Sequence, residues 1–208
     1  MITNPVKAVH NLIIVDESAS MQKLKRTVVE SLNDTIKSIQ KNHRMREGKY
    51  QRITLFTFNG LGIKMRRFNQ WADQVKLLEY EEYKPNSTTP MLDCIGTSVG
   101  MIRAANDESE RVLVTIISDG LENGSVKYCL KAIRGIITSM KDLGWIFNYV
   151  GAHHDVAEFC KTLNISNSYQ INLNEIERMS IKDKLSVIVK QNSLYNENVM
   201  ATAHCEAA

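Results

Sequence analysis

Two continuous runs of aliphatic residues most constrain how this chain can fold. They are NLIIV at residues 11–15 and VLVTII at 112–117. A strand covered on one face alternates apolar with polar residues, whereas a run this uniform predicts a parallel strand buried on both faces. The segments WIFNYVGA at 145–152 and SYQINL at 168–173 carry a weaker strand signal. The chain therefore needs helices above and below a central sheet.

Segments with helical periodicity separate these predicted strands. In each of them, apolar side chains recur every three or four residues. They are Met21, Leu24, Val28, Leu32, Ile36 and Ile39 in the first segment, Leu92, Ile95, Val99 and Ile102 in the second, and Val126, Leu130, Ile133 and Ile137 in the third. This alternation predicts a doubly wound, Rossmann-like α/β sheet that is mostly parallel and has helices on both faces.

One segment departs from the alternation. RITLFTF at 52–58 and IKMRRF at 63–68 flank Asn59-Gly60-Leu61-Gly62. An Asn-Gly pair between two strand-like runs is typical of a β-hairpin. We therefore expect one antiparallel strand at the edge of the sheet.

Length and composition fit a single domain. The chain has 208 residues, of which 43% are apolar, and this is enough to bury one full core. We predict one domain at 1–195, in which a capping box at Ser180-x-x-Asp183 begins a final helix. The periodicity then fades, and 196–208 forms a C-terminal tail without assigned structure.

Charge and cysteine usage exclude several classes of protein. The 26 basic and 23 acidic side chains leave a net charge of +3, too small to indicate a nucleic-acid surface. Neither a secretion signal nor a membrane-spanning apolar run is recognisable. The cysteines are far apart, which is typical of reduced thiols; they are Cys94, Cys129, Cys160 and Cys205. We expect a cytoplasmic protein with neither a nucleic-acid nor a membrane partner.

The stretch Asp16-Glu17-Ser18-Ala19-Ser20 directly follows the first predicted strand. Alternate residues of an extended backbone project to one side, so Asp16, Ser18 and Ser20 can present three oxygen atoms to one point. Glu17 then points away from that point, and we expect it at the surface. Helix capping is the alternative role for this stretch, but capping requires only one side chain.

Two further junctions between a strand and a helix carry similar residues. Thr89 stands before Pro90 at the start of the second predicted helix, where the alternative role is an N-cap. Asp119 and Gly120 follow the strand at 112–117, where the alternative role is an ordinary turn. Because the carboxyl ends of parallel strands meet at one rim of a sheet, we expect all three junctions to converge.

The converging side chains would form a set of ligands made only of oxygen. The set is Asp16, Ser18, Ser20, Thr89 and Asp119. Such a set suits a hard divalent cation and suits zinc or copper poorly. Two carboxylates balance the charge of the ion and the hydroxyls add none, so the bound cation can still accept an acidic group from a partner.

These three motifs resemble the metal-ion-dependent adhesion site of von Willebrand factor type A domains. Asp16-Glu17-Ser18-Ala19-Ser20-Met21 resembles the family's DxSGSM motif. Thr89-Pro90-Met91-Leu92-Asp93 resembles its TPLxD stretch, and Ser118-Asp119-Gly120 resembles its TDG or SDG loop. The motifs occur in the family's order, and the resemblance extends from about Val9 to Leu173. It therefore implies the type A fold for most of the chain.

The resemblance also implies roles for the ligands. Ser18, Ser20 and Thr89 would bind through their hydroxyls, and Asp16 and Asp119 would bind directly or through water. Magnesium is the expected ion, with manganese able to replace it.

Two departures from the family's motifs leave every ligand in place. Ala19 stands where the family usually has glycine, and Ser87-Thr88 replace a common glycine pair. Both changes are expected to stiffen the loops, which argues against a large metal-linked switch.

The resemblance implies a protein-interaction module that captures an Asp or Glu of a partner protein through the cation. We expect an intracellular scaffold or adaptor, working with an ATPase or in a multi-subunit complex. The competing hypothesis is a magnesium-dependent phosphohydrolase of the haloacid-dehalogenase type, which also has an aspartate after its first strand. That chemistry needs a second carboxylate at the position of Ser18, so we predict a binding protein and no enzyme.

Two other groups of polar residues are weaker candidates. His153 and His154 follow the strand at 145–152, but no second ligand cluster lies near them in the sequence. We interpret them as part of a loop before a helix. Glu122 and Asn123 lie just past Asp119, and we expect them to shape the turn rather than to surround the metal.

Overall fold

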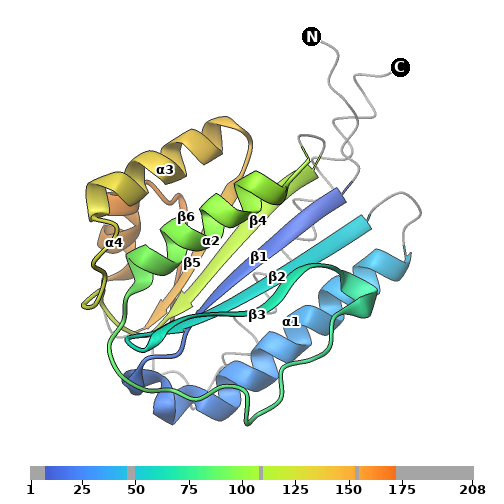
Figure 1. The fold of residues 1–208 in the computed structure, drawn as a ribbon, viewed down its shortest axis with the longest axis horizontal. Coiled ribbons are helices and arrows are strands. Elements are labelled where there is room, and N and C mark those ends of the chain that lie inside the picture. The colour runs from blue at the N-terminus through green and yellow to red at the C-terminus, as the bar shows by residue number, and fades with distance from the viewer. Residues whose placement is uncertain (1–7, 46–49, 108–109, 153–154, 172–208) are drawn as a thin grey trace.

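The computed structural model describes residues 8–45, 50–107, 110–152 and 155–171. A six-stranded sheet in the order β3-β2-β1-β4-β5-β6 runs through its middle (Figure 1). The strands are β1 (Ala8–Asp16), β2 (Tyr50–Asn59), β3 (Gly62–Trp71), β4 (Glu110–Ser118), β5 (Ile146–Ala152) and β6 (Asn167–Ile171). The helices are α1 (Lys25–Met45), α2 (Met91–Ala105), α3 (Leu130–Asp142) and α4 (Val156–Leu163), with short 3₁₀ helices at Ala19–Leu24 and Ala72–Gln74.

The pairing of the strands confirms the predicted topology. β1 pairs in parallel with β2 on one side and with β4 on the other. β4, β5 and β6 continue the parallel arrangement. Among the described strands, β3 alone runs antiparallel to its neighbour, and it forms an edge of the sheet. The hairpin predicted from the Asn-Gly pair is therefore present, and its tip lies at the carboxyl end of β2.

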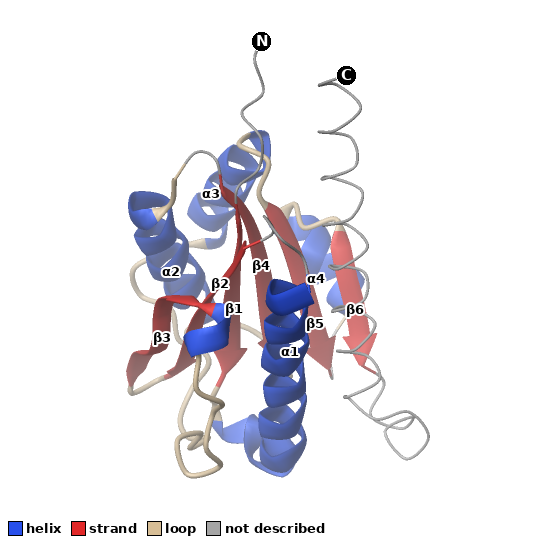
Figure 2. Ribbon diagram, turned by 90° about the vertical axis from the view of Figure 1, so that its right-hand side faces the viewer, coloured by secondary structure: helices blue, strands red, loops and turns tan. Residues whose placement is uncertain are grey.

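Each face of the sheet has its own hydrophobic core, which explains the uniform apolar run in β1. Leu12 and Ile14 belong to one core cluster together with residues of α2, α3 and α4. Ile13 and Val15 face the other way and belong to a second cluster together with residues of α1. Figure 2 shows α1 on the opposite face of the sheet from α2 and α3. Both faces are buried there, so apolar residues occupy both sets of alternate positions from Leu12 to Val15.

Two predicted helices begin later than their periodicity indicated. Met21 and Leu24 belong to the 3₁₀ helix, and α1 starts at Lys25. Val126 lies in a loop with its side chain 90% exposed, and α3 starts at Leu130. The loop keeps its shape because the amides at 126–128 donate to the carboxylate of Asp93, a partner that helical periodicity cannot reveal.

Several predictions lie outside the described residues. These are the final helix after Ser180, the tail at 196–208, and the side chains of His153, His154 and Cys205. Within the part of the chain that the structure describes, the helices are all too short or too polar to cross a membrane.

Candidate metal centre

Asp16 ends β1, and its side chain is fully buried. Oδ1 accepts a hydrogen bond from the Ser18 amide at 2.7 Å, and Oδ2 accepts one from the Ser118 hydroxyl at 2.6 Å. Burial raises the pKa of Asp16 to about 6; these hydrogen bonds oppose the rise, and the charge of Asp119 adds to it. The ionised carboxylate is thus costly at this position, and a bound cation would offset that cost.

Contacts between oxygen atoms connect the first loop to the third. The hydroxyls of Ser18 and Ser20 lie 3.1 Å apart, and the Ser20 hydroxyl donates to Oδ1 of Asp119 at 2.7 Å. Adjacent oxygen ligands of an octahedral magnesium ion lie roughly 3 Å apart, given metal–oxygen distances of about 2.1 Å. The spacing of these three side chains therefore fits such an ion.

Thr89 faces the same point from the second loop. A methyl group added at Gly120 would lie 3.7 Å from the Ser20 hydroxyl oxygen and 3.8 Å from that of Thr89. Gly120 directly follows Asp119, so the hydroxyls of Thr89 and Ser20 lie on the same side of the third loop. The structure thus brings all three predicted loops together at the carboxyl ends of β1 and β4.

The N-cap alternative for Thr89 does not describe the start of α2. The helix begins at Met91, and the capping position is Pro90, whose side chain makes no capping hydrogen bond. Glu122 instead accepts a hydrogen bond from the Leu92 amide at 2.9 Å. The hydroxyl of Thr89 is therefore not required for capping.

The third loop is fastened to the start of α2 by reciprocal hydrogen bonds. The Asn123 side chain accepts from the Thr89 amide at 2.8 Å, and the Asn123 amide donates to the Thr89 carbonyl at 3.2 Å. Glu122 also accepts from the amides of Gly124 and Ser125, at 2.8 and 2.7 Å. This confirms that Glu122 and Asn123 shape the turn. It also means that the loops carrying Thr89 and Asp119 form one unit.

Asp93 also connects α2 to the third loop, and no role for it was predicted from the sequence. Its buried carboxylate accepts hydrogen bonds from the amides of Val126, Lys127 and Tyr128 at 2.9, 2.9 and 2.8 Å. The position of Asp93 in the first turn of α2 was the available signal, because a carboxylate there can collect amides from a neighbouring loop.

The expectation that Glu17 lies at the surface is wrong. Its side chain is 0% exposed and pairs with Lys64 at 3.2 Å and with Arg66 at 3.0 Å. Both basic residues come from β3. Backbone alternation indicates which side chains share a side of the chain, but it cannot show that a hairpin covers the other side.

The donor set fits a hard divalent cation. Of the predicted ligands, Asp16, Ser18, Thr89 and Asp119 are buried and offer only oxygen. Across the described ranges, no cluster of three or more His, Cys, Asp or Glu side chains forms an alternative metal site. Hydroxyl groups would therefore supply most of the ligands, as magnesium or manganese accepts and zinc does not favour.

No protein-family model and no curated protein matches the sequence. Solved structures do match its fold. The von Willebrand factor domain of the type V pilus tip protein Mfa5 from Porphyromonas gingivalis aligns with a TM-score of 0.60 at 9% identity, over 92% of this chain and 97% of that one. A von Willebrand factor type A protein from Catenulispora acidiphila aligns with a TM-score of 0.58 at 12% identity, over 89% of this chain and 42% of that one.

A third match is the manganese-loaded TRAP protein from Plasmodium vivax, with a TM-score of 0.56 at 16% identity, over 83% of this chain and 71% of that one. At such identities the likeness concerns the fold. The chain has the α/β fold of von Willebrand factor type A domains, with an antiparallel strand at one edge of the sheet.

Proposed function

We propose that this chain is a metal-dependent protein-interaction module. A magnesium or manganese ion held by the candidate ligands would bind the carboxylate of an Asp or Glu from a partner protein. The ligands are Asp16, Ser18, Ser20, Thr89 and Asp119. The observation that carries the proposal is the position of the Ser20 hydroxyl, which contacts Ser18 within its own loop and Asp119 in another.

The charge of the site explains why it would capture an acidic group. Asp16 and Asp119 together balance the charge of a divalent ion, and the three hydroxyl ligands add no negative charge, so the ion can still accept an anionic ligand. A carboxylate from a partner is the group that such an ion favours. The ion itself recognises only the carboxylate, so the surface of the surrounding loops would determine which partner binds.

The arrangement around Asp16 disfavours the phosphohydrolase hypothesis. Both carboxylate oxygens accept hydrogen bonds, from the Ser18 amide and from the Ser118 hydroxyl. A nucleophilic aspartate needs an oxygen directed at the substrate and an acid–base group beside it. The residue two positions later is Ser18, which cannot act as a carboxylic acid. We therefore propose binding without catalysis.

The setting that we propose is a cytoplasmic scaffold or adaptor within a multi-subunit assembly, with an ATPase as one class of partner. The free thiols of Cys94, Cys129 and Cys160 support a reducing compartment. The partner would be recognised by an exposed Asp or Glu on its surface.

Metal titration tests the proposal directly. Calorimetry with manganese and magnesium should show one site in the wild type, and Asp16→Ala or Asp119→Ala should abolish it. Asp34→Ala is the matched control, because Asp34 lies on α1 and pairs with Lys37 at 3.6 Å. A metal at about 100 times its Kd should raise the free energy of unfolding by about 2.7 kcal/mol. Equal binding by wild type and Asp16→Ala would refute the site.

A further inference from the structure

Glu17 is a buried charge within the first candidate loop, between Asp16 and Ser18. Its Oε1 accepts hydrogen bonds from the Lys84 amide at 2.6 Å and from Lys64 Nζ at 3.2 Å. Its Oε2 accepts one from Arg66 Nη2 at 3.0 Å. A buried carboxylate with this many donors resists displacement, because moving it away would leave its charge and that of Arg66 without partners.

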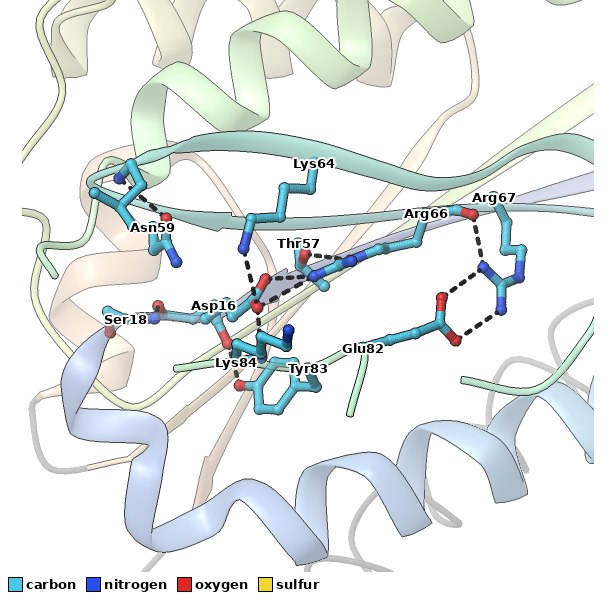
Figure 3. Close-up of polar contacts among 12 residues, drawn as sticks. Asp16, Ser18, Thr57, Asn59, Lys64, Arg66, Arg67, Glu82, Tyr83 and Lys84 are labelled. Carbon is cyan, nitrogen blue, oxygen red and sulfur yellow. Dashed lines mark hydrogen bonds and ion pairs between the residues drawn. The ribbon is translucent and has the colours of Figure 1, made fainter. Parts of the chain in front are cut away.

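The donors to Glu17 come from two separate parts of the chain; Figure 3 labels these donors, Lys64, Arg66 and Lys84. Lys64 and Arg66 belong to β3, and Arg66 is itself held by a hydrogen bond from Nε to the Thr57 hydroxyl at 2.9 Å. Lys84 belongs to the segment that leads to Thr89. The side chain of Glu17 therefore connects the first loop to the hairpin and to the second loop.

The backbone around Glu17 makes the same connections. Its amide donates to the Phe58 carbonyl at 2.7 Å, and its carbonyl accepts from the Asn86 amide at 2.9 Å. Two residues further on, the Ala19 amide donates to the Ser87 carbonyl at 3.0 Å. The backbone that carries Ser18 is thus fixed on both sides.

We propose that Glu17 is a positioning residue for the candidate metal centre. It holds the first loop so that Ser18 and Ser20 meet Asp119, and it takes no part in binding the ion. The inference rests on the proposed function. Lys64 and Arg66 also balance the charge of Glu17, so the site keeps the two uncompensated carboxylates that suit a divalent cation.

Glu82, in the segment that follows β3, offers a matched control because it also pairs with an arginine of β3. It accepts two hydrogen bonds from Arg67, both at 3.2 Å, and one from the Glu79 amide at 2.8 Å. It therefore resembles Glu17 in charge and in its type of partner. Glu82 lies outside the first loop, so Glu82→Gln disturbs the ion pairs of β3 without touching the backbone between Asp16 and Ser20.

The first measurement is manganese affinity of the folded variants. Glu17→Gln should weaken binding by about tenfold or more, as the loss of groups that orient metal ligands does. Glu17→Asp should also weaken manganese binding, because the aspartate side chain is shorter by one methylene group. Glu82→Gln should bind like the wild type. Unchanged affinity in Glu17→Gln would overturn the proposal.

A double variant separates positioning from general stability. In Glu17→Gln/Arg66→Met, the arginine is no longer left without its carboxylate, so much of the stability lost in Glu17→Gln should return. The manganese affinity should stay low. Recovery of affinity together with stability would show that Glu17 acts only on the fold.

Hydrogen exchange in the metal-free protein tests the positioning role of Glu17 separately from metal binding. Glu17→Gln should speed exchange at the amides of Ser18 and Ser20, whereas Glu82→Gln should leave it unchanged. Absence of metal binding by the wild type, with faster exchange in Glu17→Gln, would refute the proposed function and retain Glu17 as the residue that orders the loop. Unchanged exchange at both amides would refute the role of Glu17.

Discussion

The hydroxyl of Ser118 donates a hydrogen bond to Oδ2 of Asp16 at 2.6 Å, joining the ends of β4 and β1. Ser118 in turn accepts a hydrogen bond from the Gly120 amide at 3.2 Å. The carboxylate of Asp16 is therefore oriented by the last residue of β4, which directly precedes Asp119. This contact makes the first and third loops interdependent even before an ion binds.

Asp16→Asn should stabilise the metal-free protein near neutral pH. Because burial raises the pKa of Asp16 to about 6, the folded state binds this proton more tightly than the unfolded state. The charged form thus lowers stability increasingly as pH rises from about 4 to about 6. Removing the charge should recover about 1–3 kcal/mol above that range. Urea unfolding in chelator measures the gain, and a loss of stability at neutral pH would contradict the prediction.

The same variant should lose the stabilisation that manganese gives the wild type. Asp34→Asn serves as a control, because its side chain is 38% exposed and should change neither quantity. Asp16 would thus lower stability in the free protein and be required for binding.

His10 should make stability depend on pH in the opposite direction. Burial and the nearby charge of Arg52 lower its pKa to about 4, and its Nε2 lies 2.8 Å from the Thr54 hydroxyl. Between about pH 4 and 6.5 the unfolded state binds this proton and the folded state does not. The contribution of His10 is therefore complete above about 6.5 and is lost as pH falls toward 4.

The measurement compares wild type with His10→Gln across this range. The difference in free energy of unfolding should increase with pH by about 3 kcal/mol. A difference that stays constant with pH would contradict the assignment to His10.

Gly60 and Gly124 should not tolerate alanine. A Cβ atom at Gly60 would lie 2.3 Å from the Thr88 hydroxyl oxygen, and one at Gly124 would lie 2.8 Å from it. Either substitution should cost about 1–3 kcal/mol, the usual range for overpacking. Gly100→Ala and Gly135→Ala, in helices with nothing within 4 Å, should instead stabilise by about 0.5–1 kcal/mol.

The double variant Gly124→Ala/Thr88→Gly tests the cause, because the side chain closest to a Cβ at Gly124 is that of Thr88. It should be more stable than the sum of its two single changes predicts, because one residue of the pair makes room for the other. Simple additivity would show that the cost at Gly124 has another origin. Denaturant unfolding measures all of these variants.

Ser87→Gly should stabilise the fold by about 0.5–1 kcal/mol. Ser87 has a φ of 64°, in the left-handed region that glycine adopts without a steric penalty. Asn164 has a similar φ of 62°, and asparagine tolerates it better, so Asn164→Gly should gain less. Thermal unfolding compares the two, and an equal or larger gain at Asn164 would contradict this account.

Asp93→Ala should destabilise the protein by about 2–4 kcal/mol. The substitution leaves the amides of Val126, Lys127 and Tyr128 without their acceptor. Hydrogen exchange should increase in residues 121–129 and remain unchanged in β2 and β3. A uniform increase across the sheet would instead indicate that Asp93 supports the whole core.

Much of the fold could be predicted because local sequence carries it. The apolar run at 11–15, the helical periodicities and the Asn-Gly turn each depend on neighbouring residues. The burial of Glu17 and the loop position of Val126 could not be predicted in this way. Both depend on partners far along the chain, namely Arg66 for Glu17 and Asp93 for Val126.

Part of the candidate site could likewise be predicted from the sequence, and part could not. Asp16, Ser18 and Ser20 could be grouped by backbone alternation, and Thr89 and Asp119 by their place after a strand. The convergence of the loops follows from the parallel sheet. The hydrogen bonds that fasten them, such as the one from Ser118 to Asp16, require the side chains in three dimensions.

The packing of Thr88 against Gly60 and Gly124 has a consequence for recognising related chains. The side chains at positions 87 and 88 occupy the space that side chains at positions 60 and 124 would need. A sequence pattern that demands glycine before the threonine would pass over this chain. A pattern that requires a small residue on one side of each contact, at position 88 or at its neighbours 60 and 124, would detect this chain. It would also detect chains in which the small residue is on the other side.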